Sequence, residues 1–170
     1  MNIDKGKVVR IAIIALFSLS IMIAGQLIYT RYSVEKSLIN TLTQRPDIVK
    51  AELIKAPDKL WVFVELKNVD SILDAWNEIN SISKRHLRGQ MFSITILGNP
   101  NSLVEELYNN QIQYDLYEAI QTGNYSNMRE SLDETEAAEG VTIKVFIDTE
   151  RLYMHLQHGE HYLYKILERA

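Results

Sequence analysis

The chain has 170 residues, of which 46% are hydrophobic and 24% charged, a composition typical of folded proteins. It contains no cysteine, which excludes disulfides, thiolate metal sites and cysteine nucleophiles. Residues 1–31 hold four of the 18 Lys and Arg and one of the 22 Asp and Glu, which leaves residues 32–170 with a formal charge of −7. Because nucleic-acid binding normally needs a basic face, we expect no nucleic-acid partner.

An uncharged run of twenty residues, 11–30, lies between Arg10 and Arg31 and includes six Ile, three Leu and one Phe. As a helix this run would extend about 30 Å, which is the thickness of the hydrocarbon core of a bilayer. A cleaved signal peptide is the alternative, but the apolar run continues through residues 21–24, after the small-x-small sequence at 18–20. We therefore predict an uncleaved transmembrane helix over 11–30 that inserts in the lipid bilayer.

The basic residues around this span indicate its orientation. Three of them lie close before it, within residues 5–10, whereas those after it are more widely spaced. The positive-inside rule then predicts that residues 1–10 are cytoplasmic in a single-pass protein of the cell membrane. Apolar residues at helical spacing continue as far as Pro46, which predicts a helical stalk over 31–45 and a compact extracytoplasmic α+β domain over 46–170.

Turn residues divide the compact domain into segments with either helical or alternating patterns of apolar residues. Asp70 is the expected N-cap of one helix, and Ser102 with Glu105 is expected to form a capping box at the start of the next. The predicted order is helix 33–43, strands 49–53 and 60–66 paired as a hairpin, helix 70–88, strand 91–97, helices 102–120 and 126–138, and antiparallel strands 141–147, 152–157 and 161–167.

The order helix–strand–strand–helix–strand over residues 33–98 resembles that of ring-building modules in the membrane complexes of secretion and sporulation. Many α+β modules share this order, so the resemblance concerns the fold and carries no functional residue. It is compatible with a part in an envelope assembly.

The strand predicted at residues 60–66 is apolar on both faces, with Trp61 and Phe63 on one of them. An antiparallel sheet with one face in water would show polar residues there. Either the helices of the second half cover this face, which we favour because they need a sheet to pack on, or a partner covers it. Trp61 and Phe63 are therefore candidate residues of an interaction surface.

Three of the four histidines fall within residues 155–161, which makes His155, His158 and His161 weak candidate metal ligands. A two-residue turn at 158–159 would place His155 opposite Tyr162 and leave no shared site. A three-residue loop would instead place His155 opposite His161, and that pair could share a metal. We favour an exposed hairpin tip and expect neither a metal nor another cofactor.

Two charged runs have simple structural interpretations. The basic run 84–88 lies at the predicted C-terminus of a helix, where cations complement the helix dipole; a phosphate or lipid site is the alternative. The acidic residues between 130 and 139 are expected on a solvated helix face, since they lack the Gly-containing loop of a calcium site.

The chain lacks the sequence motifs of serine hydrolases, nucleotide-binding loops and zinc proteases. We therefore expect a non-enzymatic, membrane-anchored protein that binds another protein, or a second copy of itself, outside the cytoplasm. A sensory or small-ligand-binding ectodomain is the alternative, and it would need a cavity of roughly 300 Å³ or more with converging polar groups. An enzyme assembled from residues distant in sequence is a third, less favoured class.

Overall fold

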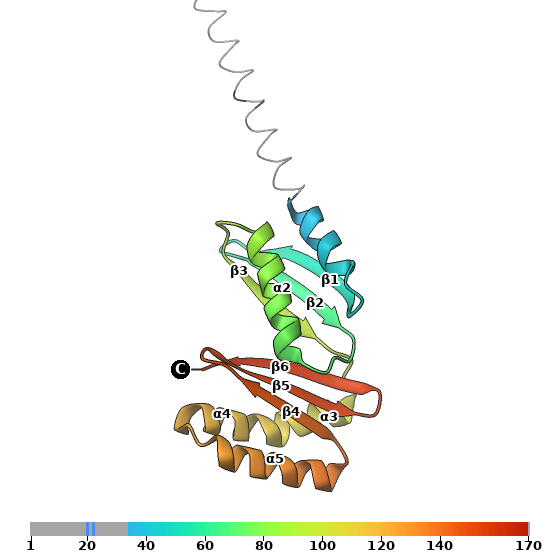
Figure 1. The fold of residues 1–170 in the computed structure, drawn as a ribbon, viewed down its shortest axis with the longest axis vertical. Helices are drawn as coiled ribbons and strands as arrows, with labels where there is room; N and C mark the ends of the chain where they lie inside the picture. Colours follow the sequence, from blue (N-terminus) through green and yellow to red (C-terminus); the bar gives the residue numbers. More distant parts are fainter. Residues whose placement is uncertain (1–19, 21, 23–33, 170) are drawn as a thin grey trace, which may run out of the picture.

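The computed structural model describes residues 20, 22 and 34–169. These residues form an α+β fold with two three-stranded sheets (Figure 1). After a helix at residues 34–43, the elements are β1 (Ile48–Lys55), β2 (Leu60–Leu66), α2 (Ile72–His86), β3 (Phe92–Leu97), α3 (Ser102–Leu107), a π-helical turn η1 (Tyr108–Ile112), α4 (Gln113–Thr122), α5 (Tyr125–Glu139), β4 (Thr142–Ile147), β5 (Arg151–His158) and β6 (His161–Glu168).

The predicted transmembrane helix at 11–30 lies outside the described residues, apart from Ser20 and Met22. In the part of the chain that the structure does describe, no helix is both long and apolar enough to span a bilayer.

The first sheet has the strand order β1-β2-β3, and it confirms the predicted hairpin and the helix–strand–strand–helix–strand order. β1 is antiparallel to β2, whereas β3 is parallel to β2. A parallel neighbour cannot be reached by a tight turn, so α2 serves as the crossover between β2 and β3. Helix 34–43 and α2 both cover the same face of this sheet (Figure 1).

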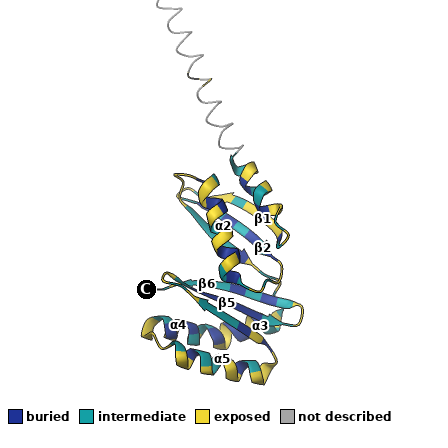
Figure 2. Ribbon diagram, in the orientation of Figure 1, coloured by how far each residue is buried: buried dark blue, intermediate teal, exposed yellow. Residues whose placement is uncertain are grey.

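The first half of the domain, residues 34–97, ends with β3, and the rest of the described chain forms the second half. The core of the first half lies between these two helices and the sheet. Leu60, Val62, Val64 and Leu66 alternate along β2 and are almost fully buried. In Figure 2 the α2 ribbon alternates between buried and exposed residues, as expected for an amphipathic helix. The buried apolar residues of α2 are Ile72, Ala75, Trp76, Ile79 and Ile82, and those of helix 34–43 are Leu38 and Leu42.

The second sheet has the order β4-β5-β6 with antiparallel pairing throughout, as predicted. The helices α3, α4 and α5 all pack on one face of it (Figure 1). Alternate residues of β5, including Met154 and Leu156, contact these helices and form a second core. Tyr153 and His155 lie between them on the opposite face, so β5 is buried on both sides.

Both predicted helix caps are wrong by one residue. Ser71, not Asp70, caps α2 by accepting a hydrogen bond from the Asp74 N–H at 3.2 Å. Asn101, not Ser102, caps α3 by accepting one from the Val104 N–H at 3.0 Å, so the predicted capping box does not form. Asp, Ser and Asn all cap helices well, so residue type alone does not choose between neighbouring positions.

The helix predicted over 102–120 is interrupted by the π-helical turn η1 between α3 and α4. Tyr108, Ile112 and Leu116 are buried at a spacing of four residues. An α-helix has 3.6 residues per turn, so residues at this spacing would drift around its surface. The extra residue of the π turn keeps all three on the second core.

Hydrogen bonds from the second sheet join the two halves. The Tyr162 hydroxyl donates to the Leu66 carbonyl at 2.9 Å. The Tyr164 hydroxyl donates to the Lys67 carbonyl and accepts from the Val69 N–H, each at 2.9 Å. Burial raises the pKa of Tyr164 to about 12, so this hydroxyl keeps its proton.

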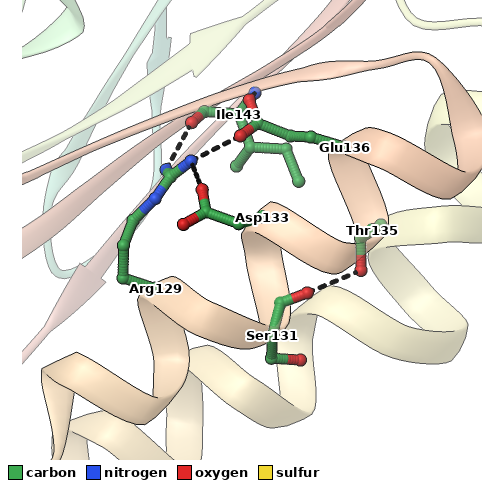
Figure 3. Close-up of polar contacts among 6 residues, drawn as sticks. All are labelled: Arg129, Ser131, Asp133, Thr135, Glu136 and Ile143. Carbon is green, nitrogen blue, oxygen red and sulfur yellow. Dashed lines mark hydrogen bonds and ion pairs between the residues drawn. The ribbon is translucent and has the colours of Figure 1, made fainter.

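Arg129 and Glu136 attach α5 to the edge strand β4 through the backbone of Ile143 (Figure 3). Arg129 donates to the Ile143 carbonyl at 2.9 Å and forms ion pairs with Asp133 and Glu136. The Glu136 carboxylate in turn accepts from the Ile143 N–H at 2.5 Å. The acidic run of this helix is exposed, as predicted, at Glu130, Asp133, Glu134 and Glu139. Glu136 is the exception, because its half-buried carboxylate holds the helix on the sheet.

Candidate interaction surface

The face of the first sheet opposite the helices carries apolar side chains on all three strands. Trp61 and Phe63 lie on the central strand β2 and stack with their ring centroids 6.3 Å apart. Ile54 on β1 pairs with Trp61, and Leu97 on β3 pairs with Glu65, two residues beyond Phe63 on β2. Ile54 is 50% exposed and Leu97 45% exposed. We call these four residues the outer patch.

No described helix covers the outer patch. Trp61 and Phe63 are partly buried and belong to neither hydrophobic core. The helices α3, α4 and α5 pack on the second sheet instead, so our expectation that they would cover this face is wrong. Their apolar stripes are already satisfied by a sheet of their own, which periodicity within one segment does not reveal.

The border of the outer patch is polar and carries both signs of charge. Lys59 Nζ lies 4.0 Å from the centroid of the Trp61 ring, close enough for a cation–π contact. Lys50 and Glu52 form an exposed ion pair of 2.5 Å on β1. An apolar centre with a polar border is the usual anatomy of a protein–protein interface.

The histidines lie in a register that neither of the two predicted ones matches. His158 pairs with His161 across a two-residue turn at Gly159 and Glu160, and His155 pairs with Tyr164. Gly159 has a φ of +61°, which suits the first central position of a type II′ turn. His155 and His161 therefore lie on opposite faces of the hairpin and cannot share a metal.

His155 is the most unusual buried group of the second sheet. It is 1% exposed, and its ring centroid lies 4.8 Å from that of Tyr164. Neither ring nitrogen has a hydrogen-bond partner in the protein. Burial lowers the pKa of His155 to about 4; Lys144 adds to this effect and Asp70 opposes it. The imidazole is thus held neutral in the junction between the halves.

We predict that the three histidines of this hairpin bind no zinc at a stoichiometric site, because zinc needs three or four converging ligands. Across the described residues, no cluster of three or more His, Asp or Glu side chains is placed to hold a metal. Calorimetric titration of the protein with zinc should give no saturable submicromolar binding. A saturable site that disappears when any one of His155, His158 and His161 is replaced by alanine would contradict this prediction.

An open groove lies where α2 and β3 meet the second sheet. It has a volume of about 390 Å³ and is lined by Trp76, Lys84, Glu150 and Arg151, among others. Arg151 bonds Glu150 at 2.8 Å, and its guanidinium lies 5.5 Å from the centroid of the Trp76 ring. The groove therefore has the size and some of the polar groups that a small-ligand site would need.

Comparisons of the chain with protein-family models, with curated proteins and with solved structures found no match. Any functional assignment therefore rests on the residues and the geometry described above.

Proposed function

We propose that this protein is a membrane-anchored, non-enzymatic interaction module whose domain lies outside the cytoplasm and binds protein through the outer patch. The observation that supports it is the apolar face formed by Ile54, Trp61, Phe63 and Leu97, which no described element covers. Single exposed apolar residues are common, but a contiguous patch with an aromatic centre is typical of binding surfaces.

The patch favours either a second copy of the chain or another protein with a matching apolar surface. It spans three strands, of which the two outer ones lie about 10 Å apart, and is smaller than one side of a standard stable interface. A weak contact of this size becomes effective when both partners are confined to one membrane, because confinement raises their effective concentration. This is the physical reason to combine the patch with the anchor predicted at residues 11–30.

The test is replacement of Trp61 by alanine. A central interface tryptophan typically contributes 2 kcal/mol or more, so association should weaken by about thirtyfold. The free energy of unfolding should change by only about 1 kcal/mol, because the ring is outside both cores. Sedimentation of the purified protein and quantitative cross-linking in membranes would measure the association.

Tyr117→Ala is the matched control, since Tyr117 is 51% exposed on α4, outside the outer patch. It should change neither association nor stability. If Trp61→Ala instead destabilises the fold by several kcal/mol and leaves association unchanged, the patch is part of a core and the proposal is wrong.

A small-ligand-binding function is the second candidate, and the 390 Å³ groove at Trp76 and Arg151 supports it. The two functions depend on different residues. A ligand bound in the groove would raise the melting temperature of the Trp61→Ala protein as much as that of the wild type. The same ligand would not raise the melting temperature of Arg151→Ala.

A further inference from the structure

Basic residues collect at one end of a domain that is acidic overall. We call this end the basic pole and define it as residues 34–36, 55–60 and 84–91. These segments are the start of helix 34–43, the β1–β2 turn, and the end of α2 with the loop that follows it, and they lie at the same end of the domain (Figure 1). The pole has two carboxylates, Glu35 and Asp58, against six cations: Lys36, Lys55, Lys59, Lys84, Arg85 and Arg88.

Contacts hold the three segments together, so the pole is a built feature of the fold. The basic run of α2 packs beside helix 34–43, and the β1–β2 turn is tied both to that helix and to the loop before β3. The contacts are Thr41 Oγ1 to His86 Nε2 at 3.4 Å, Lys55 Nζ to Glu35 Oε1 at 2.6 Å, and the Leu60 N–H to the Met91 carbonyl at 2.9 Å.

The cations of the pole are mostly left without carboxylate partners. Within the described chain, Lys55 is the only one of the six that forms an ion pair. Elsewhere in the domain, ion pairs are formed by Arg45, Lys50, Arg129, Lys144 and Arg151. The dipole of α2 accounts for Lys84 and Arg85 in its last turn, but not for Lys36 or Lys59, which belong to other elements.

The pole is also the end of the domain nearest the predicted membrane span. That span ends at residue 30, and four Cα–Cα steps separate it from Val34 at the start of the described helix. In any conformation, four residues reach at most about 14 Å. This upper bound is less than twice the screening length of about 8 Å at physiological salt, so the cations of the pole can come within reach of the headgroups.

We propose that the basic pole binds the anionic phospholipid headgroups around the point where the span leaves the bilayer, and so holds the domain end-on to the membrane. This inference rests on the proposed membrane anchor. Cations close to an anionic surface each strengthen binding by about fivefold. Met91, which is 73% exposed at the tip of the pole, would lie at the headgroup level.

An end-on domain has a consequence for the interaction surface. The outer patch lies on the face of the first sheet, whereas the pole lies at the end of its strands. With the pole on the headgroups, the patch faces sideways, toward other proteins in the same membrane. A domain that tumbled freely on its stalk would present the patch in all directions and bind neighbours less effectively.

The experiment uses the full chain and its lack of cysteine. A fluorophore is attached at Met91→Cys, and the protein is reconstituted in vesicles that carry a nitroxide on a fraction of the headgroups. The vesicles contain either phosphatidylcholine alone or phosphatidylcholine mixed with phosphatidylglycerol. We expect strong quenching only in the mixed vesicles, reversed by high salt and lost in the double variant Arg85→Glu/Arg88→Glu.

Lys67→Glu is the matched control, because Lys67 is an exposed lysine that follows the opposite end of β2 from Lys59. It should leave the quenching unchanged. Equal quenching in both kinds of vesicle, or quenching that survives the double charge reversal, would overturn the inference.

Flotation of the protein with phosphatidylcholine vesicles tests the anchor separately, since the pole has no affinity for them. If the protein floats with these vesicles but its label is quenched equally in both lipids, the proposed anchor stands and the proposed binding of headgroups by the basic pole is wrong. Protein that floats only with anionic vesicles, and only at low salt, refutes the anchor and supports the pole.

Discussion

Replacing Gly98 by alanine is expected to destabilise the protein by about 2–3 kcal/mol, the upper range for overpacking a tightly packed site. A Cβ atom at this position would lie 2.5 Å from the Tyr162 carbonyl oxygen, which is closer than real contacts allow. The oxygen belongs to the backbone and cannot rotate away as a side chain could. Moving it would strain the bridge in which the Tyr162 N–H donates to the Asn99 carbonyl at 3.1 Å.

Gly123→Ala separates this clash from the general cost of losing a glycine. Gly123 has a φ of +73° but open space around its Cα, so alanine there costs only backbone strain of about 1 kcal/mol. Urea denaturation followed by far-UV circular dichroism would measure both variants, because the helices that give this signal lie in both halves. A smaller loss for Gly98→Ala than for Gly123→Ala would show that the two halves do not meet as described.

The second large effect is a loss of stability in acid that is caused by His155. Its pKa is about 4 in the folded protein and 6.5 in a solvated chain, so the unfolded state binds the proton more readily. The stabilisation of the folded state by the neutral His155 is complete above pH 6.5 and is lost progressively as the pH falls toward 4. The difference in pKa corresponds to about 3 kcal/mol in the free energy of unfolding.

His155→Phe should remove this pH dependence. At neutral pH it should change stability by about 1 kcal/mol or less, because neither ring nitrogen gives up a hydrogen bond within the protein. His158→Phe at the hairpin tip is the control and should keep the wild-type pH dependence. Denaturation curves recorded between pH 4 and pH 7 give the free energy of unfolding as a function of pH. If it still falls with pH in His155→Phe as in the wild type, other groups cause the loss of stability in acid.

The sequence predicted most of the secondary structure because the relevant signals are local. Alternation along residues 60–66 and helical spacing in α2 both reflect which side of one element is buried. Glycines at the ends of elements marked the turns, as Gly140 does with its left-handed conformation after α5. The pairing of the last three strands followed from the short turns between them.

The features that the sequence could not predict depend on contacts between distant segments. The outer patch was identified from Trp61 and Phe63, but whether it is covered depended on where the later helices pack. The burial of His155 depends on which residue begins the hairpin turn. A shift of that turn by one residue changes the register of the strands and moves the side chains of one strand to the opposite face of the sheet. The basic pole combines three segments, of which only the run at 84–88 was visible as a cluster.

Site-specific photo-cross-linking in native membranes tests the central claim most directly. A photoreactive amino acid placed at Ile54 or Leu97, both on the outer patch, should give a discrete protein adduct on irradiation. The adduct should disappear in a Trp61→Ala background, and the same amino acid at Tyr114, which is 63% exposed on α4, should give none. An adduct of twice the mass of the chain would identify a second copy as the partner. No adduct at the patch, or one that survives the loss of Trp61, would contradict the claim that this face binds protein.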